Sequence, residues 1–311
     1  MMRLNEQARG VFIIAVTPFT DSGDLDLSST DRLVEFYLER GATGLTVLGM
    51  MGEAPKLTVG ESLAYVERVV ERVAGRVPVV AGASGAGLAP MRELAEEMMQ
   101  AGAAGVMVAP PSHLRTDDQL VTYYSQVGQA IGSDTPFVLQ DFPLATSVQI
   151  PTQAIVRIVN DNPNCVMLKH EDWPGLAKIS ALRQAEAEGR MRRISILVGN
   201  GGLFLPEELG RGADGAMTGF GYPEMMAEVY AAYAVGDAER GRDLFDAYLP
   251  LARYEQQPGF GLAVRKYVLA RRGAIASAAL RTPGPKLSSA DIGEIECLIE
   301  RQESRLKELH Q

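Results

Sequence analysis

The stretch Cys165-Val166-Met167-Leu168-Lys169-His170-Glu171-Asp172 contains four consecutive apolar or weakly polar residues followed at once by a lysine. A strand that is apolar at every position is typical of a parallel sheet covered on both faces. Similar short runs, with helical patterns between them, occupy residues 11–19, 44–49, 78–84, 105–111, 136–142, 195–200 and 214–220. With 165–171 they make eight strand–helix units in roughly 220 residues, which predicts an α/β fold of the (β/α)8 or TIM barrel type.

The segments between these runs carry the start signals of helices. Thr58 with Glu61, and Thr116 with Gln119, have the spacing of a capping box, in which paired side chains satisfy free backbone N–H groups. Apolar residues recur at helical spacing in two of these segments, and we expect them to pack against the outside of the barrel: Leu33, Phe36, Tyr37, Leu63, Val66, Val69 and Val70.

After Phe220 only helical patterns remain, with breaks at 236–237, 257–259 and 282–285. We therefore expect residues 1–235 to form the catalytic barrel. Residues 236–311 are expected to form a C-terminal extension of three helices and not a second catalytic domain.

Composition excludes several classes of function. Hydrophobic residues make up 46% and charged residues 22%, as in an ordinary globular protein. The net charge of −9 argues against nucleic acid and anionic membrane surfaces as partners. No apolar signal core occupies residues 1–10 and no apolar run approaches the ~20 residues of a membrane helix, so we expect a cytoplasmic protein.

Motifs for cofactors are also missing. Cys165 and Cys297 give no disulfide framework, and His113, His170 and His310 show no metal-ligand spacing. There is no phosphate loop, and Gly85 to Pro90 is a poor dinucleotide fingerprint. We expect neither a metal nor an organic cofactor.

Lysine occurs at six positions, and only Lys169 directly follows an apolar, strand-like run. Burial disfavours a charged amine, and the neutral amine is the form that attacks a carbonyl to make a Schiff base. Two alternatives stay open: a lysine whose ammonium reaches water, and a buried ion pair with Glu171. The other five lysines have polar or helical neighbours, and we expect them to be solvated: Lys56, Lys178, Lys266, Lys286 and Lys307.

In such barrels the active site lies at the carboxyl ends of the strands. Gly49-Met50-Met51-Gly52 follows one strand, and its N–H groups can either cradle a carboxylate or simply make a packing turn. Gly199-Asn200-Gly201-Gly202 follows another and is open to the same two readings. No Arg or Lys lies beside the second turn, which disfavours a phosphate site.

Several motifs recur in a fixed order: Val16 to Phe19, Gly41 and Gly44, Leu48 to Glu53, Pro78 to Gly82, the strand into Lys169, and Gly212 to Gly215. In this order and spacing, over nearly the whole chain, they resemble the dihydrodipicolinate synthase / N-acetylneuraminate lyase family. The resemblance implies a (β/α)8 barrel with a helical C-terminal extension, usually a homotetramer, and a lysine that forms a Schiff base with a 2-keto acid. Lys169 falls on that lysine.

Departures from the family pattern indicate a subgroup. Met50 and Met51 stand where the family usually has two threonines, Gln140 where it has a tyrosine, and Ser112 where a second tyrosine is expected. The proton relay of the synthases and lyases is therefore missing. Ala145 occupies the place of an arginine with which the synthases hold a second carboxylate, so dihydrodipicolinate synthesis is disfavoured.

Glu171 suggests a replacement for that relay, because alternate strand side chains share a face and a carboxylate beside a Schiff base is a suitable general acid/base. Residues 140–143, 169–172, 199–202 and 218–220 are similar to the L-2-keto-3-deoxyarabonate dehydratases. The resemblance implies that Lys169 forms an imine with the substrate, that Glu171 moves the proton, and that the enzyme loses water from the C4 hydroxyl. The expected substrate-binding residues are Gly49, Met50, Met51, Gln140, Gly199, Asn200 and Thr218.

Two rival functions remain. A pyruvate-dependent aldolase or lyase of the same family would cleave C3–C4 through the same imine, but it needs a base that Gln140 cannot supply. A non-catalytic keto-acid-binding protein is the other, and retention of both Lys169 and Glu171 speaks against it. Asp141 and His170 are expected to point away from the barrel lumen.

Overall fold

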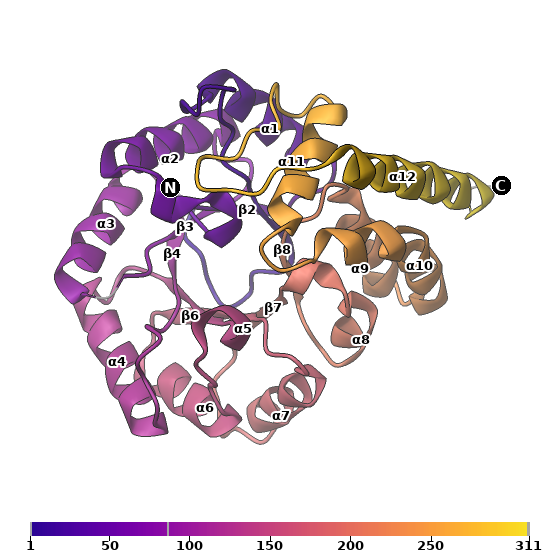
Figure 1. Cartoon of the computed structure of the whole chain (residues 1–311). Coiled ribbons are helices and arrows are strands. Elements are labelled where there is room, and N and C mark those ends of the chain that lie inside the picture. The colour runs from indigo at the N-terminus through magenta and orange to yellow at the C-terminus, as the bar shows by residue number, and fades with distance from the viewer. Residues whose placement is uncertain (1, 86, 310–311) are drawn as a thin grey trace.

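A computed structural model describes residues 2–85 and 87–309, so Ala86 and His310 lie outside the described residues. Eight parallel strands close in chain order into a barrel (Figure 1). They are β1 Gly10–Ile14, β2 Gly44–Val47, β3 Val79–Gly82, β4 Gly105–Val108, β5 Phe137–Asp141, β6 Cys165–His170, β7 Ser195–Val198 and β8 Gly215–Thr218. The predicted (β/α)8 fold is confirmed, and the predicted runs exceed the strands mainly because their last residues form the loops at the barrel mouth.

Helices surround the barrel: α1 Leu27–Glu39, α2 Val59–Val73, α3 Leu88–Gln100, α4 Asp117–Ala130, α6 Thr152–Asp161, α7 Leu176–Ala187, α8 Leu205–Gly210 and α9 Glu224–Ala234. Short helical turns follow three strands: η1 Met50–Gly52 and η2 Ala54–Lys56 after β2, α5 Pro143–Thr146 after β5, and η3 Asn200–Gly202 after β7. Both predicted capping boxes are present, at the starts of α2 and α4.

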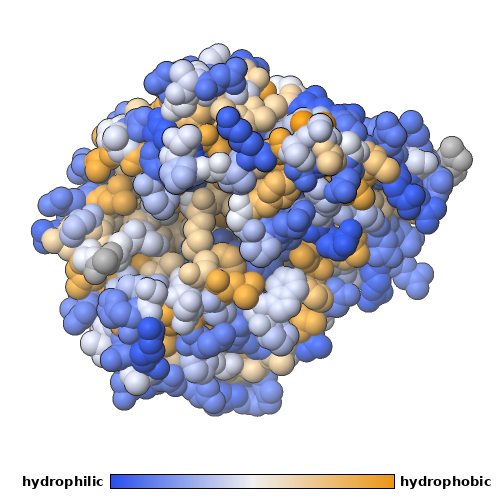
Figure 2. Space-filling model, viewed as in Figure 1, coloured by the Kyte–Doolittle hydropathy of each residue, from blue (hydrophilic) through white to orange (hydrophobic). Residues whose placement is uncertain are grey.

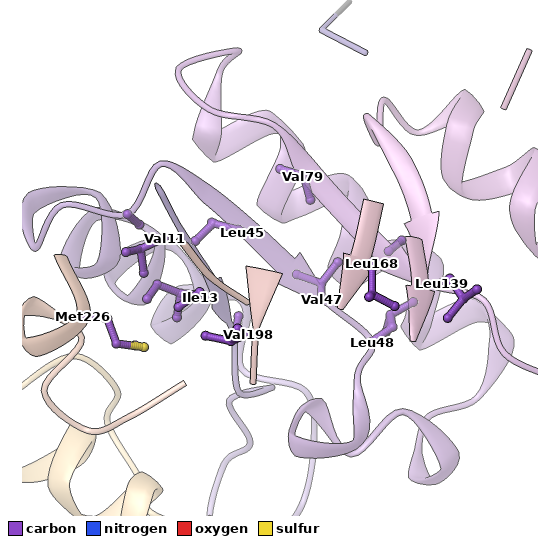
Figure 3. Close-up of a cluster of buried hydrophobic side chains, with 14 of the residues drawn as sticks. Val11, Ile13, Leu45, Val47, Leu48, Val79, Leu139, Leu168, Val198 and Met226 are labelled. Atoms are coloured by element: carbon purple, nitrogen blue, oxygen red, sulfur yellow. The ribbon is translucent and has the colours of Figure 1, made fainter. Parts of the chain in front are cut away.

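The core has two layers because strand side chains alternate between them. Phe12, Met167 and Met217 belong to a cluster inside the lumen. The larger outer cluster joins the strands to the helices, and Figure 3 shows part of it, including Leu168 of β6 and Val198 of β7. Since Met167 faces inward and Leu168 outward, this alternation places Lys169 on the lumen side of β6. The apolar helical residues predicted to cover the barrel all belong to the outer cluster or pack against it.

The C-terminal segment contains α10 Ala238–Glu255, α11 Gly261–Arg271 and α12 Ser289–Leu309, and α12 projects away from the barrel in Figure 1. The helical pattern predicted between α11 and the break at 282–285 is wrong, because residues 272–288 form no helix. This irregular segment instead packs against the start of the barrel: the N–H of Ala276 donates to Ser29 Oγ of α1. Within the described chain, no helix is both long and apolar enough to cross a membrane.

Candidate active site

A buried set of polar side chains lies at the carboxyl ends of β5 and β6. Lys169 Nζ is 2.8 Å from Glu171 Oε2, and the side chains are 7% and 6% exposed. Gln140 Nε2 donates to the same Glu171 oxygen at 2.8 Å, and its strand position is paired with that of Lys169. Figure 2 shows a hollow over the centre of the barrel. The ion pair that the sequence left open is therefore present, and the carboxylate is placed to accept a proton from the amine.

The turn after β7 is shaped around Glu171. A Cβ atom on Gly199 would lie 2.2 Å from Glu171 Cγ, so a side chain here would displace the carboxylate. Asn200 Nδ2 donates to the Glu171 carbonyl oxygen at 3.1 Å. The Gly201 N–H donates to Thr218 Oγ1 at 2.9 Å, which ties the turn to β8. The predicted residues Gly199, Asn200 and Thr218 thus lie in or against the turn after β7, and the hydrogen bonds of Asn200 and Thr218 hold this turn.

The turn after β2 presents free backbone donors. No described residue accepts a hydrogen bond from the N–H of Met50 or Met51. The turn is fixed from both sides, since Gly52 N–H donates to Gly49 O at 3.0 Å and Thr17 Oγ1 donates to Gly52 O at 2.6 Å. The Met51 side chain packs against the lumen cluster, whereas Met50 is 45% exposed. Two unused N–H groups in a rigid turn are suited to a carboxylate.

A second polar cluster lies on the outer side of these two strands. Lys178 Nζ of α7 contacts Asp141 Oδ2 at 2.8 Å and Asp172 Oδ2 at 2.6 Å. His170 Nδ1 is 3.5 Å from the same Asp141 oxygen, and His170 Nε2 contacts Gly175 O. The expectation that Lys178 is solvated is wrong, because its side chain is only 11% exposed. The cluster braces the strand ends that carry Gln140 and Glu171.

The structure also buries charged groups that sequence reasoning missed. Lys266 was expected to be solvated and is fully buried, where it pairs with Glu53 at 2.7 Å. Burial lowers the pKa of Lys266 to about 8, against the opposing effect of Glu53. Glu208 is 8% exposed, and burial, with Glu207 and Glu171 nearby, raises its pKa to about 8. The ion-pair partner of Lys266, Glu53, is 213 positions away, so no local sequence signal marks the burial of this lysine.

Metal-binding residues do not cluster in the described ranges: no group of three or more His, Cys, Asp or Glu side chains there could hold an ion. Cys165 and Cys297 are both free thiols, the first buried and the second exposed.

Comparison with known proteins gives consistent matches along the chain. The model of the dihydrodipicolinate synthetase family matches residues 7–302. An L-2-keto-3-deoxyarabonate dehydratase from Azospirillum brasilense is 31% identical over 283 residues, which cover 90% of this chain and 89% of the relative. A 4-hydroxy-tetrahydrodipicolinate synthase from Thiobacillus denitrificans is 31% identical over 258 residues, with coverages of 78% and 80%. The crystal structure of a dihydrodipicolinate synthase from Rhodopseudomonas palustris superimposes with a TM-score of 0.95 at 51% identity, covering 97% of this chain and 100% of that one.

Proposed function

Because this chain belongs to the dihydrodipicolinate synthetase family, we propose that it is a Schiff-base lyase that removes water from a 2-keto-3-deoxy sugar acid. The proposed substrate is L-2-keto-3-deoxyarabonate, and the products are 2,5-dioxopentanoate and water. One observation carries this choice: a single oxygen of Glu171 contacts both the Lys169 amine and the Gln140 amide, at 2.8 Å each.

Catalysis begins with attack of the Lys169 amine on the C2 ketone, with Glu171 as the acceptor of the ammonium proton. Loss of water from C2 gives the imine, whose electron withdrawal acidifies the C3 hydrogens. The substrate carboxylate lies against the N–H groups of Met50 and Met51. These groups bind it without a competing cationic side chain.

Glu171 then removes a C3 proton and returns it to the C4 hydroxyl, which leaves as water while the C3–C4 double bond forms. Loss of one C5 proton and of the C5 hydroxyl proton, balanced by protonation at C3 and at C4, converts the remaining C5 alcohol into an aldehyde. Hydrolysis of the imine frees Lys169 and 2,5-dioxopentanoate. Gln140 donates to Glu171 and keeps its carboxylate directed at C3 and C4, while Asn200 and Thr218 orient the hydroxyl groups from the β7 and β8 side.

The rival that keeps the same imine is carbon–carbon cleavage or condensation, as the relatives named as synthases suggest. Retro-aldol cleavage needs a base for the C4 hydroxyl proton, and synthesis of a dicarboxylate needs a cation for the second carboxyl group. Gln140 cannot titrate, and Ala145, after β5, carries no charge. Both facts favour loss of water. A keto-acid-binding protein without activity would not require the Glu171–Lys169 contact.

The proposal extends to assembly and location. Family members typically form oligomers and act on small molecules, and we propose a cytoplasmic homotetramer that acts in pentose metabolism. Its mass in solution, measured by light scattering, should be four times 33.5 kDa. A monomer would contradict this part alone.

Borohydride reduction with the substrate present tests the imine. We expect a reduced adduct whose mass maps to Lys169. A Glu171→Gln variant that still forms the adduct should turn over about 10²–10⁴-fold more slowly, the usual contribution of a general acid/base. No adduct on Lys169 would exclude every Schiff-base mechanism, and undiminished turnover by Glu171→Gln would remove Glu171 from its role.

A further inference from the structure

Glu53 terminates the turn that bears the Met50 and Met51 N–H groups, and its backbone is unusual. Its φ of 54° lies in the left-handed region, which a non-glycine residue adopts only when its surroundings hold it there. The Glu53 N–H donates to Met50 O at 3.0 Å, which closes η1. The position of the Glu53 side chain is therefore coupled directly to the turn that presents the two free donors.

Three donors hold the Glu53 carboxylate, which is 2% exposed. Lys266 Nζ of α11 donates to Oε1 at 2.7 Å, and Lys56 Nζ of η2 donates to Oε2 at 2.8 Å. The third donor is the Arg281 N–H of the 272–288 segment, at 3.1 Å from Oε2. Two of the three come from the C-terminal segment of the chain.

Further contacts fix the Lys266 ammonium in this position. Its ammonium also donates to Ala279 O at 2.9 Å, and it lies 4.5 Å from the centre of the Phe19 ring. The Arg281 guanidinium lies over the same ring at 4.5 Å and pairs with Glu61 of α2. Two ammonium groups share one carboxylate, which leaves an excess of positive charge next to η1.

We propose that Lys266 and Glu53 are positioning residues of the substrate-carboxylate subsite. Their ion pair fixes η1 so that the Met50 and Met51 N–H groups converge on one point, and the excess positive charge behind the turn favours an anion there. This role rests on the proposed function only in requiring a 2-keto acid that forms an imine with Lys169. The C-terminal segment thus completes the binding site from outside the barrel.

The positioning role predicts an effect on binding that a purely structural ion pair would not have. Loss of the pair should weaken binding of ketones that carry a carboxylate, and should spare ketones that lack one. Pyruvate and hydroxyacetone form such a matched pair of probes, because they differ in the group next to the carbonyl. Borohydride trapping on Lys169, followed by mass spectrometry as a function of ketone concentration, reports on both.

For Lys266→Met we expect the half-saturating pyruvate concentration to rise at least tenfold, with less than a twofold change for hydroxyacetone. Lys307→Met removes one charge from an exposed position of α12 and should match the wild type with both ketones. Glu53→Gln keeps the side-chain shape but breaks the ion pair that fixes η1. Pyruvate trapping should therefore weaken in this variant as well, even though the net positive charge behind the turn increases. Glu53→Gln takes the place of Lys266→Met if the latter does not fold.

Equal losses with both ketones, or unchanged pyruvate trapping in a folded variant, would overturn the positioning role. Results that contradict the proposed function can be distinguished from these. Absence of any Lys169 adduct in the wild type would remove the Schiff base itself, whereas carbon–carbon cleavage in place of dehydration would leave the carboxylate test intact.

Discussion

In the proposed mechanism, Lys169 and Glu171 divide the chemistry at the scale of single residues. The lysine forms the imine, and the glutamate distinguishes loss of water from the making or breaking of carbon chains. Gly199 contributes by having no side chain, because this absence allows Glu171 to reach Lys169 and Gln140.

A residue-scale prediction concerns Glu208, whose pKa burial raises from 4.5 to about 8. Between these values the folded state keeps a proton that the unfolded state has lost, so this carboxyl group makes stability fall as pH rises. Glu208→Gln removes that titration. The free energy of unfolding of the variant relative to wild type should therefore rise by up to about 1.4 kcal/mol per pH unit from about pH 4.5 to 8, then level off.

Urea denaturation at several pH values measures this difference. Glu300→Gln is the control, since this carboxylate lies at an exposed position of α12, away from Glu208. Parallel curves for Glu208→Gln and wild type would show that Glu208 ionises normally in the folded protein.

Sequence alone predicts the residues whose partners are close along the chain. Lys169 lies in β6 and Glu171 follows the strand two positions later, so continued alternation is enough to place them together. Glu53 and Lys266 are not predictable in this way, because their contact depends on how α11 and residues 272–288 fold back onto η1. Lys266 has helical neighbours in sequence, and only this long-range packing buries it.

At the scale of elements, continuous apolar runs were sufficient to locate all eight strands, since both faces of each are covered. The region 272–288 was predicted less well because its residues make tertiary contacts in place of an internal hydrogen-bonding pattern. Local signals therefore identify elements with a regular hydrogen-bonding pattern, and they fail where irregular tertiary contacts hold the backbone.

The capping box at the start of α4 gives an element-scale prediction. Thr116 Oγ1 accepts from the Gln119 N–H, and Gln119 Oε1 accepts from the Thr116 N–H. Thr116→Ala should lower the free energy of unfolding by about 1 kcal/mol, through loss of an N-cap acceptor. In urea denaturation the midpoint should fall with an unchanged slope. Ser304→Ala, at an exposed position within α12, should change the free energy of unfolding by less than about 0.5 kcal/mol. Equal effects of Thr116→Ala and Ser304→Ala would contradict the capping role.

At the scale of the whole molecule, we propose that the boundary at residue 235 separates two parts of one folding unit. Residues of α10 and α11, including Tyr248 and Val268, belong to the same apolar cluster as the barrel helices. A buried ion pair and a buried hydrogen bond also cross this boundary: Lys266 pairs with Glu53, and Arg265 Nη2 donates to Gly219 O after β8.

Barrel and extension should therefore unfold together. The single tryptophan, Trp173, reports on the barrel mouth, and a fluorophore on the exposed Cys297 reports on α12, since Cys165 is buried. The two probes should give one urea midpoint. Separate midpoints would mean that the extension is an independent domain.

Product analysis tests the central claim most directly. Purified protein is incubated with L-2-keto-3-deoxyarabonate and the products are identified by NMR and mass spectrometry. The proposed mechanism predicts 2,5-dioxopentanoate, with one water lost per substrate and with loss of activity in Lys169→Ala. Pyruvate and glycolaldehyde in its place would show that the Lys169 imine leads to carbon–carbon cleavage and would contradict the assignment of Glu171 to dehydration.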